Sequence, residues 1–176
     1  MIILMGVAGA GKSMQGRILA DEKGYSWIST GEILRVLVTG KRRQEMLEGK
    51  LLSDPEMIRM MDRVFDLIDT HEEFILDGFP RTVKQADWLI DQVHLGRFDI
   101  TAVFHLSADE DVVLERLKSR GRHDDTEEAI KNRFDEYRAV TLPMLADFRN
   151  RGVTVHDIDG SRTPEEVHQD IAQYVD

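Results

Sequence analysis

Residues 1–13 read MIILMGVAGAGKS, and this stretch decides the fold. An apolar run leads directly into GVAGAGKS at positions 6–13, which is a complete GxxxxGK[ST] pattern. A strand that enters a glycine-rich turn and then a helix aims backbone N–H groups and a helix N-terminus at one point. Glycine permits the close turn, and Lys12 can reach the β and γ oxygens of a polyphosphate. The stretch therefore predicts a phosphate-binding loop rather than a chance glycine-rich turn.

The composition is typical of one globular domain that works without thiols. The chain has 176 residues, of which 41% are hydrophobic and 32% charged, and no apolar stretch approaches the roughly 20 residues of a membrane span. Because its first residues already predict a strand, there is no room for a signal peptide, and a cytoplasmic location is expected. The lack of cysteine excludes disulfides and cysteine zinc sites. A net charge of −10 argues against nucleic-acid binding. We expect a monomer with small-molecule ligands and with neither nucleic acid nor membrane as a partner.

Apolar runs alternate with helical periodicity along the chain. After the run at 1–5, further runs lie at 25–29, 74–76, 100–106 and 153–158. Five strands joined by four crossovers predict an α/β fold, in which a parallel sheet carries helices on both faces.

Two stretches depart from this alternation. The segment 30–73 is longer than one crossover helix requires, and its helical pattern is broken near Gly40 and within 49–55. We therefore predict an inserted helical subdomain there. The second stretch is the short loop 119–125, which precedes a helix that starts near Thr126.

The third predicted strand ends in the sequence FILDGFPR, residues 74–81. An acid at the tip of an apolar strand can form a turn, cap a helix or orient Mg²⁺ and its waters. The phosphate loop favours the metal role for Asp77. His105, within the fourth strand, is expected to be a buried histidine with satisfied hydrogen bonds rather than a ligand.

Five segments together resemble the successive signatures of the nucleoside monophosphate kinases, and most closely those of the adenylate kinase family. They occur in the order of the family and cover nearly the whole chain. The segments are Gly9–Lys12, Ser29–Arg35, Gly49–Leu52, Asp77–Gln85 and Gly121–Asp125.

The resemblance implies a P-loop NTPase-like fold with a five-stranded parallel sheet and a single kinase domain at 1–176. It further implies a small helical insertion that binds the nucleoside monophosphate (NMP) and a very short lid loop. The implied division is a core of 1–29, 74–118 and 126–176, an NMP-binding insertion at about 30–73 and a lid at about 119–125.

The resemblance also implies roles for individual residues. Those implied in catalysis are Lys12, Arg81, Arg120, Arg122 and Arg133. Those implied in ATP binding are Gly9, Ala10, Gly11, Lys12, Ser13, Met14, Arg116, Arg120 and Gly160. Those implied in AMP binding are Thr30, Arg35, Leu52, Gly78, Arg81, Gln85, Arg122 and Arg133. Mg²⁺, bound with ATP, is assigned to Ser13 and, through water, to Asp77.

Chemistry independently favours such a set of arginines. Two polyphosphates held for in-line transfer create a large negative charge, to which a protein contributes mainly positioning and charge stabilisation. Planar guanidinium groups suit that task, although a single arginine is more often on a solvated face. Asp124 and Asp125 are expected to accept from these arginines or to cap the next helix.

The chain departs from the family pattern at three places. Ser13-Met14 replaces the usual Gly-Thr after the lysine, Glu32 replaces an aspartate, and only Gly121 separates Arg120 from Arg122. Because the hydroxyl after the lysine ligates Mg²⁺ in many phosphate loops, we expect Ser13 to be a direct ligand and Met14 to pack inward.

The expected activity is reversible transfer from Mg·ATP to AMP, which gives two ADP. UMP, CMP or another monophosphate is the alternative acceptor, but Thr30 and Gln85 resemble the AMP-accepting pattern. A nucleotide-binding protein without kinase activity is the other alternative. It would be expected to lack the lysine, the Mg²⁺ acid or a lid arginine, and all of these are present.

Overall fold

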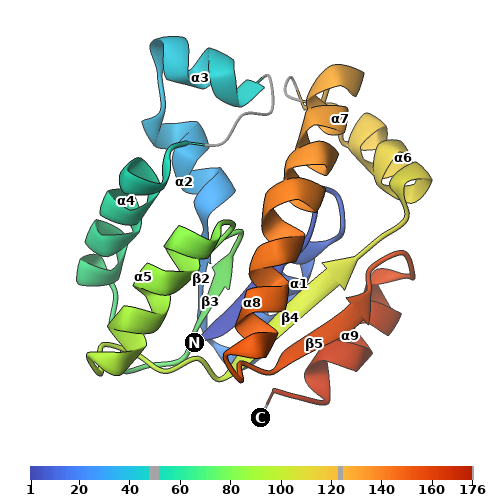
Figure 1. The fold of residues 1–176 in the computed structure, drawn as a ribbon. Helices are drawn as coiled ribbons and strands as arrows, with labels where there is room; N and C mark the ends of the chain where they lie inside the picture. The colour runs from blue at the N-terminus through green and yellow to red at the C-terminus, as the bar shows by residue number, and fades with distance from the viewer. Residues whose placement is uncertain (48–51, 123–124, 176) are drawn as a thin grey trace.

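The computed structural model describes residues 1–47, 52–122 and 125–175, which form an all-parallel five-stranded sheet in the order β2-β3-β1-β4-β5 (Figure 1). The strands are β1 (Ile2–Met5), β2 (Ser26–Ser29), β3 (Phe74–Asp77), β4 (Ala102–Ser107) and β5 (Val155–Asp159). The predicted parallel sheet and its five strands are confirmed.

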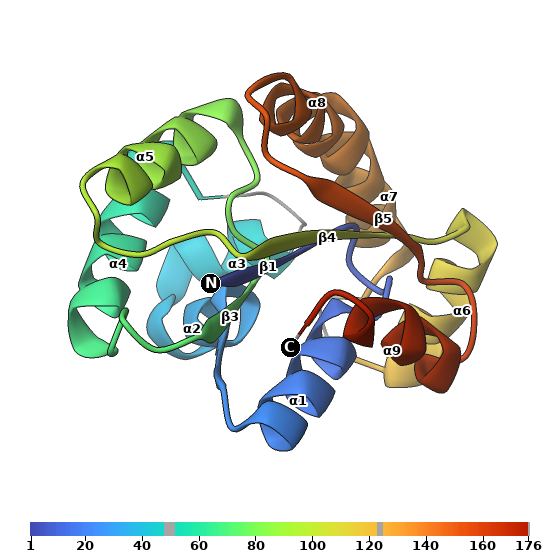
Figure 2. The ribbon, with the colours of Figure 1, turned by 90° about the horizontal axis from the view of Figure 1, so that it is seen from below.

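Helices cover both faces of the sheet (Figure 2). One face carries α4 (Asp54–Leu67), α5 (Val83–His94) and α8 (Leu142–Asn150). The other carries α1 (Lys12–Lys23), α6 (Glu110–Arg120) and α9 (Pro164–Ala172). Ile3 and Met5 of β1 belong to the first core cluster and Ile2 and Leu4 to the second. Burial on both faces explains why this strand is continuously apolar instead of alternating.

Among the described residues between β2 and β3 there are three helices, where a single crossover helix would suffice. They are α2 (Thr30–Leu37), α3 (Gly40–Leu47) and α4. In Figure 1, α2 and α3 rise beyond the carboxyl ends of the strands, opposite α7 (Glu127–Glu136). The segment 49–51 of the predicted break lies outside the described residues. The division of the chain into core, insertion and lid stays a prediction.

The helix after the short loop has an unusual turn. The helix starts next to Thr126 as predicted, and Thr126 caps it, since its Oγ1 accepts a hydrogen bond from Ala129 N at 3.2 Å. A π-helical segment, η1 (Tyr137–Thr141), joins α7 to α8, and Leu142 N–H donates to Tyr137 O. Wider turns of this kind often occur at functional sites.

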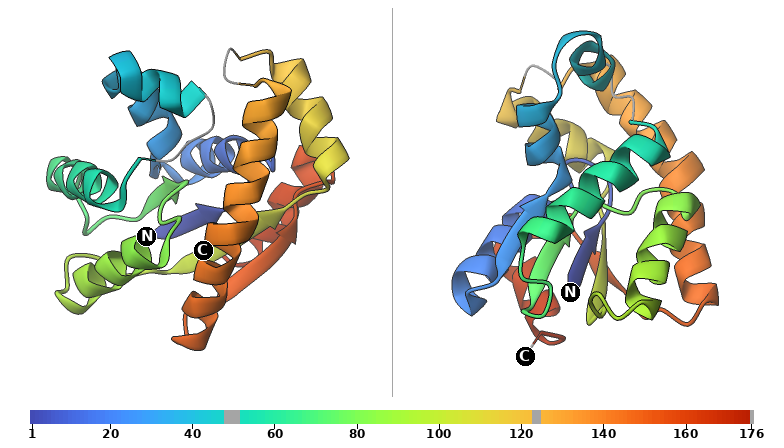
Figure 3. Two further views of the ribbon diagram at one scale, coloured as in Figure 1. Left: turned by 45° about the horizontal axis from the view of Figure 1, so that its top comes forward. Right: turned by 90° about the vertical axis from the view of Figure 1, so that its left-hand side faces the viewer.

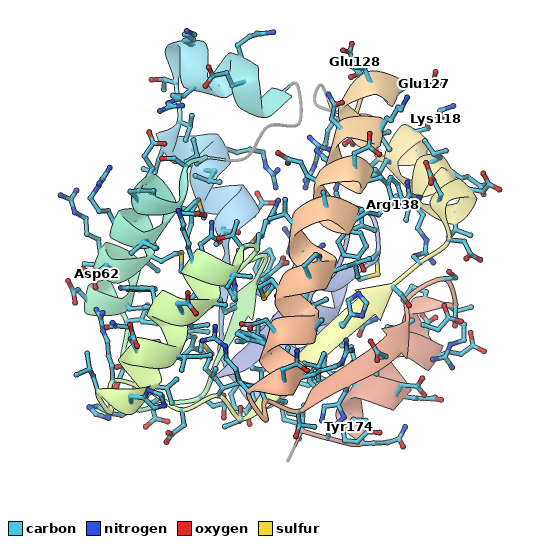
Figure 4. All side chains as sticks on the ribbon, viewed as in Figure 1. Asp62, Lys118, Glu127, Glu128, Arg138 and Tyr174 are labelled. Atoms are coloured by element: carbon cyan, nitrogen blue, oxygen red, sulfur yellow. The ribbon has the colours of Figure 1, made fainter. Side chains whose placement is uncertain are left out.

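Two ion pairs fasten this helix to α6. Lys118 Nζ lies 2.8 Å from Glu127 Oε1, and Arg138 Nη2 lies 2.6 Å from Glu110 Oε2 (Figure 4). Exposed pairs contribute at most about 1 kcal/mol each, so their effect is to orient α6 against α7 rather than to stabilise the fold. No helix within the described ranges is long and apolar enough to cross a membrane.

Candidate functional site

A cavity of about 900 Å³ lies at the carboxyl ends of β1 and β3. In Figure 3, α2 and α3 lie across from α6 and α7. Residues of α2, α6 and α7 line the cavity. The structure brings every site residue predicted from the sequence to the wall of this one cavity. These residues are Gly9, Ala10, Gly11, Lys12, Ser13, Met14, Thr30, Arg35, Leu52, Asp77, Gly78, Arg81, Gln85, Arg116, Arg120, Arg122, Arg133 and Gly160.

The glycines of the phosphate loop are required by close packing. Gly6 has φ 137°, and a Cβ there would lie 2.1 Å from Leu106 O. A Cβ on Gly9 would lie 2.8 Å from Val113 Cγ1 on α6. The loop is therefore pressed against β4 and α6, where only glycine fits. Gly11 then begins α1, and within the described chain no side chain caps that terminus. Its first N–H groups remain available to an anion.

Lys12 is a buried cation at the start of α1. Its Nζ donates to Val7 O at 2.7 Å, and the side chain is almost fully covered. Burial lowers the pKa of Lys12 to about 8, with Asp77 opposing the change and Arg81 and Arg120 adding to it. A polyphosphate bound beside Nζ would relieve this cost, because an anion favours the charged lysine.

Ser13 and Asp77 meet although they come from different elements. Ser13 Oγ, in the first turn of α1, donates to Asp77 Oδ2 at 2.6 Å at the end of β3, and Asp77 is 3% exposed. A hydroxyl and a carboxylate side by side fit a Mg²⁺ ion that takes its other ligands from phosphate and water. Within the part of the chain that the structure describes, no group of three or more His, Cys, Asp or Glu residues could hold a metal ion. The ion would therefore need ligands from phosphate and water.

The loop after β3 forms the opposite wall. Gly78 has φ 85°, and a Cβ there would lie 2.9 Å from Thr30 Oγ1 and 3.3 Å from Arg81 Nη2. Thr30 Oγ1 donates to Asp77 O at 3.1 Å, and Arg81 Nε donates to Gly78 O at 2.9 Å. Burial lowers the pKa of Arg81. Its guanidinium is thus fixed close to the end of β3, and an anionic ligand would compensate its charge.

Gln85 lies in the first turn of α5 and is 2% exposed. Its Oε1 accepts from Arg81 N at 2.9 Å, and its Nε2 donates to Asp54 Oδ1 at 2.9 Å. Thr82 Oγ1 donates to the same Asp54 oxygen at 2.7 Å. Asp54 was not predicted as a site residue, because nothing in the local sequence of α4 indicates that it meets α5.

Carboxylates hold the remaining arginines in pairs. Glu32 Oε1 accepts from Arg35 at 2.7 Å and from Arg122 at 3.3 Å, which joins α2 to the loop after α6. The hydrogen bond from Arg35 is the main reason that the pKa of Glu32 is lowered.

Asp125 holds the second pair, as expected. It accepts from Arg120 at 2.6 and 2.8 Å and from Arg133 at 3.2 Å, and its side chain is 1% exposed. Asp124, of which the same was expected, lies outside the described residues. The four guanidinium groups are thus oriented before any ligand arrives.

Arg116 shapes the loop after β5. Its Nη1 donates to Gly160 O at 2.5 Å, and its Nη2 donates to Ser161 O at 3.1 Å and Arg162 O at 3.0 Å. A Cβ on Gly160 would lie 2.5 Å from Ala10 O, so this loop touches the phosphate loop. Both terminal nitrogens of Arg116 thus donate to the protein, and the faces of the guanidinium plane suit stacking on a base.

The expectation that Met14 packs inward is wrong. Met14 is 53% exposed. The buried positions of α1 are Lys12, Gln15, Gly16 and Leu19, and a helix turns about 100° per residue, so Met14 falls on the other side of this stripe.

His105 is a structural histidine, as expected. Its Nδ1 lies 2.7 Å from Asp157 Oδ1, and its Nε2 is hydrogen-bonded to Tyr137 OH. Arg149 donates to both carboxylate oxygens of Asp157 at 2.8 Å. Tyr137 lines the cavity, and burial raises its pKa to about 12. Sequence reasoning missed Tyr137, although it lies one α-helical turn after Arg133: its N–H donates to Arg133 O, and both side chains line the cavity.

Comparison with known proteins gives one consistent result. A family profile described as adenylate kinase matches residues 4–153. The chain is 38% identical to the adenylate kinase of Mycobacterium sp. (strain MCS) over 88% of both chains. It is 36% identical to that of Corynebacterium urealyticum over 91% of both chains, and 36% identical to that of Azobacteroides pseudotrichonymphae genomovar. CFP2 over 98% of this chain and 95% of the other.

Proposed function

The chain belongs to the adenylate kinase family, and on this premise we propose that it catalyses reversible, Mg²⁺-dependent transfer of the γ-phosphoryl group of ATP to AMP, giving two ADP. The observation that carries the proposal is the shared cavity, whose wall contains both the phosphate loop and the loop Gly78–Arg81 together with several arginines. Such a cavity suits two phosphate-bearing ligands held end to end.

The donor nucleotide occupies the side of the phosphate loop. Backbone N–H groups of 9–13 and the N-terminus of α1 bind its phosphates, and Lys12 contacts the β and γ oxygens. Arg116 and the loop at Gly160 support the adenine, consistent with the three carbonyls that Arg116 holds in place.

The acceptor nucleotide occupies the side of α2 and α5. Arg35 and Arg81 bind its phosphate, while Thr30, Leu52 and Gln85 frame its base. The acceptor oxygen of AMP is already an anion, so no residue has to remove a proton from it. The reaction therefore needs no general base and no covalent intermediate.

Charge stabilisation accounts for the catalysis. Arg120, Arg122 and Arg133 reach the cavity from the side opposite α2, and the carboxylates Glu32 and Asp125 hold them ready. Guanidinium groups fixed before the reaction stabilise the charge of the transferring group without having to reorganise.

Mg²⁺ would be held by Ser13 Oγ and, through water, by Asp77, and when bound it neutralises charge on the phosphate oxygens. The adjacency of the two side chains at 2.6 Å supports this assignment. Within the chain itself, Asp77 also accepts the hydrogen bond of the Ser13 hydroxyl and so holds that group toward the end of β3. We further propose that the enzyme acts in the cytoplasm, and that it is a monomer, since the site residues predicted from the sequence gather within one chain.

A coupled assay of ADP formation tests the function. With ATP as donor and AMP, UMP, CMP, GMP and dTMP as acceptors, AMP should be favoured over the pyrimidine nucleotides by at least about tenfold in kcat/KM. Equal turnover of UMP or CMP would show that the residues around Gln85 do not select the base. No transfer to any acceptor would contradict the kinase assignment itself.

A further inference from the structure

The side-chain amide of Gln85 is held at both ends. Its oxygen faces a backbone N–H, that of Arg81, and its nitrogen faces a carboxylate, that of Asp54, each at 2.9 Å. A carboxylate can only accept, and a backbone N–H can only donate. The reversed amide would place oxygen against oxygen and N–H against N–H. These two partners therefore fix one orientation of a side chain that is 2% exposed.

Asp54 is itself fixed without a ligand. Its Oδ1 accepts from Thr82 Oγ1 at 2.7 Å, and Thr82 Oγ1 accepts in turn from Gln85 N at 3.2 Å. Asp54 is the first residue of α4, and Thr82 is the N-cap of α5. The carboxylate thus connects the two helices at the point where the Gln85 side chain begins.

The orientation has a consequence for base selection. The two partners take one lone pair and one N–H of the amide, so one N–H and one lone pair remain for a ligand in the cavity that Gln85 lines. A 6-aminopurine offers the complement, an acceptor at N1 and a donor at the 6-amino group. A 6-oxopurine offers the reverse pattern, so it would place acceptor against acceptor and donor against donor.

We propose that Asp54 is a specificity-determining residue, which favours a 6-aminopurine monophosphate (AMP) over a 6-oxopurine monophosphate (IMP) by fixing the amide of Gln85. It acts through Gln85 and is a positioning residue. The inference rests on the proposed function, in which Gln85 meets the acceptor base.

The test is the ratio of kcat/KM for AMP to kcat/KM for IMP. Asp54→Ala removes the acceptor for Gln85 Nε2, and the ratio should fall by about tenfold or more. Asp54→Asn keeps an oxygen that can accept, and it should retain the ratio within about threefold. Asp62→Ala is the matched control, because Asp62 lies on the same helix, is half exposed and pairs with Arg97 (Figure 4). Its ratio should equal that of the unmodified protein.

Calorimetric binding of AMP and IMP to the same variants, without ATP, separates this inference from the proposed function. If Asp54→Ala weakens both nucleotides equally, in kinetics and in binding, Asp54 is only structural and the inference is overturned. If the unmodified protein transfers no phosphoryl group, the proposed function fails, and the ratio of the two dissociation constants alone decides the inference. Asp54→Ser, which suits a helix start and is too short to reach Gln85, gives the same readout if the alanine variant does not fold.

Discussion

Replacement of Ser13 by alanine tests both the stability and the metal chemistry of the site. In the ligand-free protein, the change removes the 2.6 Å hydrogen bond to a carboxylate that is 3% exposed. A hydrogen bond to a buried charged group contributes about 2 kcal/mol. For a domain of this size, that loss lowers Tm by about 4 to 8 °C. Ser13→Thr keeps the hydroxyl and should retain most of the stability.

The metal requirement separates ligation from simple support of Asp77. If Ser13 Oγ ligates Mg²⁺ directly, the Mg²⁺ concentration that gives half-maximal rate should rise for Ser13→Ala and not for Ser13→Thr. The assay is ADP formation during a Mg²⁺ titration at fixed total ATP, together with thermal unfolding with and without Mg·ATP. A lower Tm with an unchanged Mg²⁺ titration and unchanged kcat/KM for ATP would refute direct ligation. The hydroxyl would then serve only to hold Asp77.

Two further predictions follow from the charges of the cavity. Arg122→Ala should lower kcat by about 10²-fold with an unchanged unfolding curve, because its guanidinium acts on charge in the transition state. Arg42→Ala, on exposed α3, is the control and should leave kcat unchanged. A lower Tm with an unchanged kcat for Arg122→Ala would show that Arg122 does not act in the reaction. Lys12→Met should stabilise the ligand-free protein by about 3 kcal/mol at pH 7, since the pKa of Lys12 is lowered from 10.5 to about 8 in the folded state. Between pH 8 and pH 10.5 the unfolded state binds more protons than the folded state, so the stability of the unmodified protein rises with pH. The difference in stability between Lys12→Met and the unmodified protein therefore becomes smaller. Denaturant unfolding at pH 7 and pH 10 measures this, and a gap that stays constant contradicts the buried charge.

Local signals were sufficient for the fold, and the residues that they predicted for the site lie on the wall of one cavity. The phosphate loop was readable because its chemistry is carried by adjacent residues of one turn, Gly6 to Ser13. The sheet was readable because parallel strands buried on both faces are continuously apolar, as β1 is. The strand order itself came from the structure: β3 pairs with β1, which brings Asp77 near Ser13, since the carboxyl ends of neighbouring parallel strands meet at one edge of the sheet.

Only the tertiary structure decided how these residues are held. Asp54 and Gln85 are 31 positions apart, and Glu32 and Arg122 are 90 apart, so no local pattern relates them. The outward direction of Met14 follows from which stripe of α1 packs on the sheet, and Tyr137 meets His105, 32 positions earlier, only in the folded chain. Sequence motifs specify residue types at fixed spacing along one segment, whereas the partners of a side chain depend on the distance between segments, which packing alone sets.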